Sequence, residues 1–459
     1  MRASAFLYPW DVVGDPDAPR RLVDLGVQQV TLAAAYHSTR ALTPRHPSRR
    51  IVTAEHAAVL YPPDAARWDG RDLRPYEQSW AAGPDPYGEA ARALTEAGLD
   101  VHSWVVLAHN SRLGAEHPQI SVRNAYGDRY PWAPCVARPE VRGYAVSLAA
   151  EAAVRPDTSG AELESCGWYG MAHLHAHDKI GGVPLGGAGQ YLMSLCFCEV
   201  CRDGYASAGA DPEELAATVV RALGPLWSGA PQAVAGDRAG EWAEVEKLLG
   251  ADLASATLRW RAGAARRLQR EAVAAVRARA AAGSGGEPGG GAGPIGGAGP
   301  IGGAAPIGGA APIGGAAPIG GAAPIGGAAP IGGAAPIGGA APGFRVLLHA
   351  DPAPHRCGAN AGVEAVEVLA HADGVVLPCP GGADGAAERA GVIRPFTPHQ
   401  AESGTLAANF NIVSGMGGSP GTLADDAAHA GGLGATEIRL YHAGLASDGD
   451  LRAVRAALG

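Results

Sequence analysis

The segment Leu25–Ala34, with the sequence LGVQQVTLAA, contains the junction on which the fold prediction depends. Gly26 ends a polar and apolar mixed run, and a β-branched run starts at Val27. Glycine adopts the left-handed conformation that ends many helices, so Gly26 predicts a helix end that a strand follows directly. The same order recurs at Gly98 and Gly434. These junctions predict repeated helix-to-strand units, which are typical of α/β proteins with a parallel sheet.

Short β-branched runs alternate with Ala-rich helical runs along the whole chain. Eight such runs match a closed barrel better than an open sheet, so we predict an α/β protein with a (β/α)8, or TIM-barrel, fold. An open doubly wound sheet is the alternative. The length of 459 residues is sufficient, because such a barrel needs about 250 residues. The predicted strands are Ala3–Tyr8, Val27–Ala34, Asp100–Ala108, Gly160–Ser165, Phe344–Ala350, Asp373–Pro378, Leu406–Val413 and Thr436–Tyr441.

A low-complexity segment interrupts this pattern before the fifth predicted strand. From Pro294 to Ala341 the chain is a run of hexads, PIGGAG once and then PIGGAA repeated. Each hexad has a proline and a single sizeable apolar side chain, so burial cannot offset the entropy of ordering the segment. We therefore predict a disordered linker over residues 283–343, with a self-association tether as the alternative. The two halves of the barrel would occupy residues 1–282 and 344–459.

A helical insertion is predicted between the fourth strand and the linker, with helical runs over Asp211–Leu226 and Trp242–Ala282. Apolar residues recur at helical spacing in the second run. Arginines occupy the opposite face, so we expect a long amphipathic helix that packs on the barrel and leaves these arginines in solvent. The apolar residues are Leu253, Trp260, Ala264, Leu268, Ala272 and Val276, and the arginines are Arg259, Arg266, Arg270 and Arg277.

The composition excludes several classes of partner. The net charge of −9 argues against a nucleic-acid partner, which needs clustered positive charge. No run of apolar residues is long enough for a membrane span, so no membrane partner is expected. The apolar run at the N-terminus ends at Pro9 and is too short for a signal peptide, so we expect a cytoplasmic protein with reduced cysteines. Nothing in the sequence indicates the oligomeric state.

Aromatic and polar residues follow several of the predicted strands. The active sites of (β/α)8 barrels lie at the C-terminal ends of the strands, so these residues are expected to converge on one rim. Aromatic faces stack on sugar rings and polar groups between them bind hydroxyls, so we predict a carbohydrate substrate. The predicted substrate-binding residues of this set are Trp10, His37, His109, Asn110, Trp168, Tyr169 and Tyr441.

Two glutamates occupy the fourth predicted strand. Because side chains alternate along a strand, Glu162 and Glu164 share one face. Glu164 is nearer the C-terminal end, which makes it the better candidate for a catalytic carboxylate. A structural ion pair with an arginine is the alternative interpretation.

The sequence around Glu164 resembles a known group of proteins. The resemblance rests on the motifs ESCGWYG at 164–170, HLHAHDK at 173–179 and LCFCEVC at 195–201, which are preceded by Asn124–Asp128 and Pro139–Tyr144. Together they resemble bacterial glycoside-hydrolase-like TIM-barrel proteins, glycosidases whose substrates are unassigned. The resemblance is greatest over the first 200 residues. It implies hydrolysis of a glycoside by acid/base catalysis, with no cofactor for catalysis.

The second catalytic carboxylate stays open between Asp351 and Asp178. Asp351 follows the fifth predicted strand, and Asp178 lies on the loop after Glu164. Many retaining barrel glycosidases carry a glutamate after the seventh strand, and the segment Asn409–Gly415 has none. A catalytically inactive carbohydrate-binding barrel is therefore a further hypothesis.

Three alternating histidines suggest another chemistry. His173, His175 and His177 place imidazoles on one face of an extended chain, and Asp178 follows them. Imidazole is a common ligand for zinc, copper, iron and nickel, so a metal-dependent hydrolase is an alternative function. Otherwise these histidines are predicted to bind sugar hydroxyls.

A cysteine cluster predicts a structural zinc site. Cys196, Cys198 and Cys201 have the short separations that let thiolates reach one tetrahedral zinc ion. A fourth ligand is needed, and Cys166, Cys135 or a histidine are the candidates. Three buried thiols without metal are the alternative.

Overall fold

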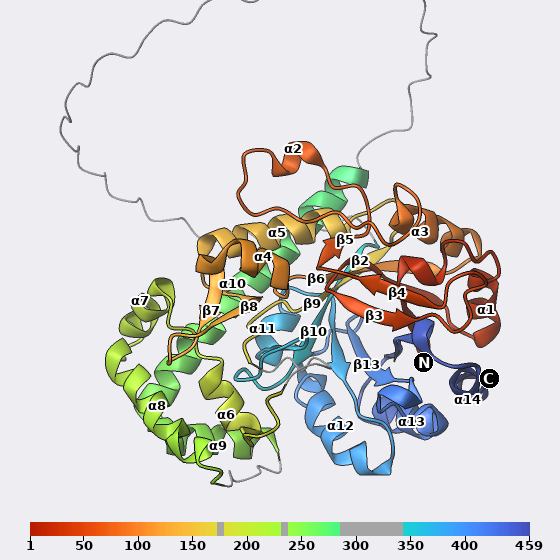
Figure 1. Ribbon diagram of the computed structural model, residues 1–459. Coiled ribbons are helices and arrows are strands. Elements are labelled where there is room, and N and C mark those ends of the chain that lie inside the picture. The colour runs from red at the N-terminus through yellow and green to blue at the C-terminus, as the bar shows by residue number, and fades with distance from the viewer. Residues whose placement is uncertain (172–178, 231–236, 285–342) are drawn as a thin grey trace, which may run out of the picture.

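The computed structural model describes residues 1–171, 179–230, 237–284 and 343–459. Its centre is a closed barrel of parallel strands, in which each strand pairs with the next and β14 pairs with β1 (Figure 1). This arrangement confirms the predicted (β/α)8 fold and excludes the open sheet. The predicted linker lies almost entirely outside the described residues. The barrel strands are β1 (Arg2–Leu7), β2 (Gln29–Tyr36), β6 (Asp100–Val106), β9 (Gly160–Glu164), β10 (Arg345–Asp351), β12 (Gly374–Pro378), β13 (Thr405–Asn411) and β14 (Glu437–Tyr441).

A helix follows each barrel strand and covers the outside of the barrel. The three glycines at the predicted junctions, Gly26, Gly98 and Gly434, have φ angles of 95°, 85° and 109°. Each therefore ends its helix in the left-handed conformation that glycine adopts without steric cost. The helices are α1 (Ala18–Leu25), α3 (Pro86–Glu96), α5 (Pro139–Ala153), α10 (Ala251–Ser284), α11 (Ala365–Leu369), α12 (Ala386–Ile393), α13 (Leu423–Gly432) and α14 (Asp448–Leu458).

Insertions follow β2, β6, β9 and β10, between the C-terminal end of the strand and its helix. They therefore build up the side of the barrel where active sites form. Helices α6 to α9 gather into a lobe beside the barrel (Figure 1). The insertions comprise β3 (Thr39–Leu42), β4 (Ile51–Ala54), β5 (Ala58–Val59), α2 (Ala65–Trp68), α4 (Ser111–Glu116), β7 (Ser121–Arg123), β8 (Arg129–Pro134), α6 (Gly186–Met193), α7 (Glu199–Ser207), α8 (Pro212–Trp227), α9 (Arg238–Leu249) and β11 (Ala361–Gly362).

The long helix before the predicted linker differs from its prediction in two respects. Gly250, with a φ of 81°, divides the expected helix into α9 and α10. The arginine face of α10 is not simply solvated, because α10 lies beside α11 and the start of β12. Arg266 pairs with Glu364 at 3.1 Å, and Arg277 pairs with Asp373 at 2.8 Å. Arg270 pairs likewise with Glu367, and Arg259 donates to the carbonyl of Ala208.

The interior of the barrel contains a buried ion-pair network. Arg439 on β14 has no exposed surface and donates from Nε to Glu162 Oε1 at 2.8 Å and from Nη1 to Glu437 Oε2 at 2.7 Å. Arg345 donates to Glu437 Oε1 at 2.7 Å. Buried charges are stable only when they are paired and hydrogen-bonded, so this network determines how the interior strands face one another.

Among the described helices, none is long and apolar enough to cross a membrane.

Replacing Arg439 by leucine should strongly destabilise the barrel. The change leaves Glu162, which has no exposed surface, without its cation, so the free energy of unfolding should fall by about 3–5 kcal/mol. Arg266→Leu is the matched control, because it removes a surface pair and should cost under about 1 kcal/mol. Urea denaturation followed by tryptophan fluorescence measures both. Equal losses in the two variants would contradict the role of the network.

Candidate active site at the mouth of the barrel

A cavity of about 550 Å³ opens at the C-terminal ends of five adjacent barrel strands. Side chains from β9, β10, β12, β13 and β14 line it, together with the loop after β10 and the first residue of α9. Its volume lies within the range of about 300–1,000 Å³ that is usual for small-ligand sites. Its polar and aromatic lining residues are Glu164, Arg238, His349, Asp351, Arg356, Cys357, Asn360, Cys379, Glu388, Asn409, Asn411 and Tyr441.

Glu164 is a buried carboxyl group with one strong hydrogen-bond donor. It is 3% exposed, and Trp104 Nε1 on β6 donates to its Oε2 at 2.8 Å. His349 Nδ1 lies 3.7 Å from the same oxygen. Burial raises the pKa of Glu164 to about 7, although the hydrogen bond from Trp104 acts in the opposite direction. Glu164 therefore keeps its proton up to neutral pH.

Glu162, two residues earlier on the same strand, has the opposite ionisation. Burial by itself would raise its pKa, but Arg439, His102 and His349 outweigh burial and lower the pKa to about 2. His349 lies between the two glutamates, and burial lowers its own pKa to about 4. The strand therefore presents one ionised carboxylate inside the barrel and one protonated carboxyl at its mouth.

Asp351 shares the cavity with Glu164 but is held in an ion pair. Arg238 donates from Nε and Nη2 to the two carboxylate oxygens, each at 2.8 Å. Arg238 also pairs with Glu388 at 2.8 Å. A single guanidinium therefore joins two of the carboxylates in the cavity wall.

Aromatic rings surround Glu164 on the side of β2 and β6. Tyr36 and His37 stack with ring centroids 4.1 Å apart, and His109 stacks on Tyr169 at 4.3 Å. The charge of Glu164 adds to the larger effect of burial in raising the pKa of Tyr36, Tyr169 and Tyr441. The structure thus brings four of the predicted substrate-binding residues, His37, His109, Tyr169 and Tyr441, to the region around Glu164.

Of these four residues Tyr441 lines the cavity itself, and three other predicted substrate-binding residues make different contacts. Trp10 is 1% exposed and stacks on Tyr8 at 4.5 Å, because the chain turns back directly after β1. The Asn110 side chain caps α4 by accepting from the backbone N–H of Leu113 at 3.0 Å. Trp168 is buried and donates to the carbonyl of Arg261 at 2.9 Å. These side chains therefore make packing and capping contacts, and their role in substrate binding stays a prediction.

The histidine run lies outside the described residues. His173, His175, His177 and Asp178 all fall within residues 172–178, so their predicted roles in sugar binding, metal binding and catalysis stay predictions. Several residues of the site were not anticipated, and two of them are instructive. Trp104 shares a face of β6 with His102, and this alternation was an available signal. Arg238 comes from the helical insertion, where no sequence pattern marks it.

A group of four buried cysteines lies in the insertions after β6 and β9. The sulfurs of Cys135, Cys196, Cys198 and Cys201 all lie within 4.8 Å of one another. Cys135 Sγ is 3.8 Å from Cys198 Sγ and 3.6 Å from Cys201 Sγ. Of the candidates for a fourth member, Cys135 belongs to the group and Cys166 does not. Four thiols that converge in this way match the donor set of a tetrahedral zinc ion.

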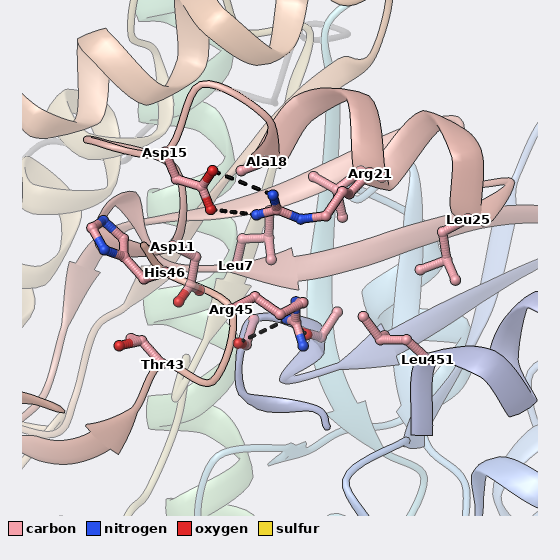
Figure 2. Close-up of a pocket in the computed structure, with 13 residues that line it drawn as sticks. Leu7, Asp11, Asp15, Ala18, Arg21, Leu25, Thr43, Arg45, His46 and Leu451 are labelled. Carbon is pink, nitrogen blue, oxygen red and sulfur yellow. Dashed lines mark hydrogen bonds and ion pairs between the residues drawn. The ribbon is translucent and has the colours of Figure 1, made fainter. Parts of the chain in front are cut away.

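A second cavity lies between α1, the loop at 43–46 and the turn after β14 (Figure 2). Asp15 faces Arg21 across it, and Arg45 donates to the carbonyl of Ala443 at 2.8 Å. Its volume is about 40 Å³, which is room for a few water molecules and not for a sugar. The mouth of the barrel is therefore the better candidate site.

The chain has limited similarity to known proteins. No protein-family model matches the chain, and no curated protein matches its sequence. An α-L-fucosidase from Paenibacillus thiaminolyticus is 12% identical with a TM-score of 0.48, and a β-galactosidase from Marinomonas ef1 is 10% identical with a TM-score of 0.49. The whole chain spans 48% and 59% of these two proteins. The PgaB glycoside hydrolase domain from Bordetella bronchiseptica is 13% identical with a TM-score of 0.45, over all of this chain and 98% of that one.

The raised pKa of Glu164 predicts a pH-dependent stability. The unfolded chain releases this proton near pH 4.5 and the folded chain near pH 7. Between these values the folded state holds one more proton, so rising pH should lower the free energy of unfolding by about 3 kcal/mol in total. Glu164→Gln should remove this decline, and Glu402→Gln, which changes an exposed glutamate, should not. Urea unfolding at several pH values measures the difference, and parallel curves for wild type and Glu164→Gln would contradict the assignment.

Proposed function

We propose that the protein is a glycoside hydrolase in which Glu164 is the general acid. The supporting observation is a buried carboxyl at the mouth of the barrel whose pKa burial raises to about 7. A carboxylic acid that keeps its proton at neutral pH can donate it to the glycosidic oxygen as the bond to the sugar breaks. Trp104 fixes one oxygen of the carboxyl group and so limits its orientation.

The composition of the cavity wall supports a carbohydrate substrate. Asn409 and Asn360 supply amide groups, and Tyr441 supplies an aromatic ring. The stacked pair of His109 and Tyr169 adds a second aromatic surface near Glu164. Aromatic faces with a few polar groups between them are suited to sugar rings and their hydroxyls.

Asp351 is the second described carboxylate at this site, and we assign it to substrate binding. Its bidentate pair with Arg238 holds both oxygens in place. Oδ1 also accepts from the backbone N–H of Ala353 at 3.0 Å, so Oδ2 is the oxygen that retains a lone pair for a sugar hydroxyl. The ion pair makes attack by Asp351 on the sugar unfavourable. In this arrangement Asp351 and Arg238 bind the sugar, and Glu164 donates the proton.

A panel of aryl glycosides and oligosaccharides tests this function. Wild-type protein should hydrolyse at least one substrate, and Glu164→Gln should lower its kcat by about 10²- to 10⁴-fold. The kcat/KM of the wild type should fall above about pH 7, as the acid loses its proton. Glu402→Gln, on an exposed loop, is the matched control and should retain activity. Turnover that is unchanged in Glu164→Gln would contradict the proposal and direct attention to the histidine run.

We also propose that Cys135, Cys196, Cys198 and Cys201 hold a structural zinc ion. Four thiolates fill all four tetrahedral positions, which leaves none for a reacting water. Cys135 follows β8 and Cys198 precedes α7, so the ion would fasten β8 to α7. On β8, the carbonyl of Trp132 accepts from the backbone N–H of Asn110 at 3.2 Å and lies 3.0 Å from His109 Nδ1. The ion would therefore support the position of His109 beside Tyr169.

Metal analysis of the purified protein should find a single zinc ion per chain. Cys135→Ser should lose it and unfold at a lower temperature, because a structural zinc contributes directly to folding free energy. Cys166→Ser is the matched control, since Cys166 is equally buried but lies outside the group, and it should keep the metal. Zinc retained in Cys135→Ser, or absent from wild type purified without chelators, would contradict the assignment.

A further inference from the structure

The seventh barrel strand presents an amide to the cavity that contains Glu164. Asn409 on β13 lies three strands from β9 in the ring and lines the same cavity. Its side-chain Oδ1 is buried and has no hydrogen-bond partner in the described part of the chain. Asn411 differs, because its Nδ2 donates to the carbonyl of Met416 at 2.7 Å and its Oδ1 accepts from Val413 N–H at 3.1 Å. Asn360, in the loop after β10, also has a buried Oδ1 without a partner in the described residues. Of the two cavity asparagines on a barrel strand, Asn409 is therefore the one whose amide oxygen is available to a ligand.

Few carboxylates can act as a nucleophile toward a sugar bound at Glu164. Within the described wall of the cavity, the carboxylates are Glu164, Asp351 and Glu388. Arg238 binds both Asp351 and Glu388. Asn409, on the strand that faces Glu164 across the cavity, is an uncharged amide and cannot attack the anomeric carbon as a carboxylate does. An amide can instead hold a nucleophile that belongs to the substrate.

We propose that the substrate is an N-acetylhexosaminide whose own acetamido group is the nucleophile, oriented by a hydrogen bond from its N–H to Asn409 Oδ1. This inference rests on the proposed glycoside hydrolase function and names its substrate class and mechanism. It also supplies the hydrogen-bond donor that the buried Oδ1 of Asn409 otherwise lacks.

The first step breaks the glycosidic bond without a protein nucleophile. The carbonyl oxygen of the acetamido group forms a bond to the anomeric carbon. The bond from that carbon to the leaving oxygen breaks, its electron pair stays on the leaving oxygen, and that oxygen takes the proton from Glu164. The products are the free alcohol and a cyclic oxazolinium ion. Asn409 Oδ1 binds the N–H group, which becomes more acidic as positive charge develops, so the hydrogen bond strengthens in the transition state.

The second step restores the enzyme. Water attacks the anomeric carbon and passes a proton to the Glu164 carboxylate. The bond from the anomeric carbon to the acetamido oxygen breaks, and its electron pair returns to the amide. The net reaction is hydrolysis with retention of configuration, and it requires no cofactor.

Paired substrates test the inference. Para-nitrophenyl N-acetylhexosaminides are compared with the corresponding hexosides, which carry a hydroxyl in place of the acetamido group, in both the gluco and galacto series and both anomers. We expect turnover of an N-acetylhexosaminide. Its kcat/KM should fall by about tenfold or more from the acetamido to the trifluoroacetamido substrate, because fluorine withdraws electrons from the attacking oxygen. Asn409→Ala should lower kcat/KM by about 10²-fold, and Asn409→Asp, which keeps an acceptor oxygen, should retain more activity.

The outcomes separate the inference from the function on which it rests. Glu164-dependent hydrolysis of the hexosides at rates equal to those of the N-acetylhexosaminides would leave the glycosidase function intact and overturn the inference. Insensitivity of the rate to fluorination would overturn it as well. Absence of turnover in both substrate classes would overturn both proposals. Thermal denaturation of Asn409→Ala and Asn409→Asp confirms that the variants are folded before their rates are compared.

Discussion

The buried contact between Glu162 and Arg439 is the interaction on which the candidate site depends. Arg439 uses its guanidinium on Glu162 and Glu437, deep in the barrel. Glu164, two residues nearer the mouth, therefore has no cation to stabilise its charge, and burial raises its pKa. If Arg439 contacted Glu164, the carboxyl at the mouth would ionise and could not serve as an acid. The barrel separates the two states by placing the guanidinium of Arg439 at Glu162, the lower of the two glutamates.

The fold could be predicted from the sequence because its signals are local. The β-branched runs, and glycines such as Gly26 that end helices, report the conformation of the few residues around them. Alternation along β9 also correctly placed Glu162 and Glu164 on one face. It could not show which of the two is paired, because Arg439 is 277 residues away from Glu162 in the chain. Arg238 was unpredictable for the same reason, since 113 residues separate it from Asp351.

The predicted site residues differ in how far local pattern determined their position. The spacing of Cys196, Cys198 and Cys201 identified three members of the thiol group, whereas the tertiary fold brings Cys135 to them from the segment that follows β8. Trp10 and Trp168 follow barrel strands as predicted, yet both side chains point into packed regions. Sequence position fixes the end of a strand to within a residue or two, but the turn that follows decides the direction of the side chain.

The charges of the cavity also favour an uncharged sugar. Arg238 is bound to Asp351 and Glu388, and Arg356 is bound to Glu241 by a hydrogen bond of 2.9 Å from Nε. Both cations in the described wall are therefore already neutralised, and an acidic sugar would have to displace a carboxylate to gain a counter-charge. A neutral sugar ring needs no counter-charge. Its hydroxyl and acetamido groups can form hydrogen bonds with the lone pairs and amide atoms of the cavity wall that have no partner. The same holds for Glu164, whose pKa is set by burial and by a neutral donor, Trp104, so both parts of the cavity favour a neutral ligand.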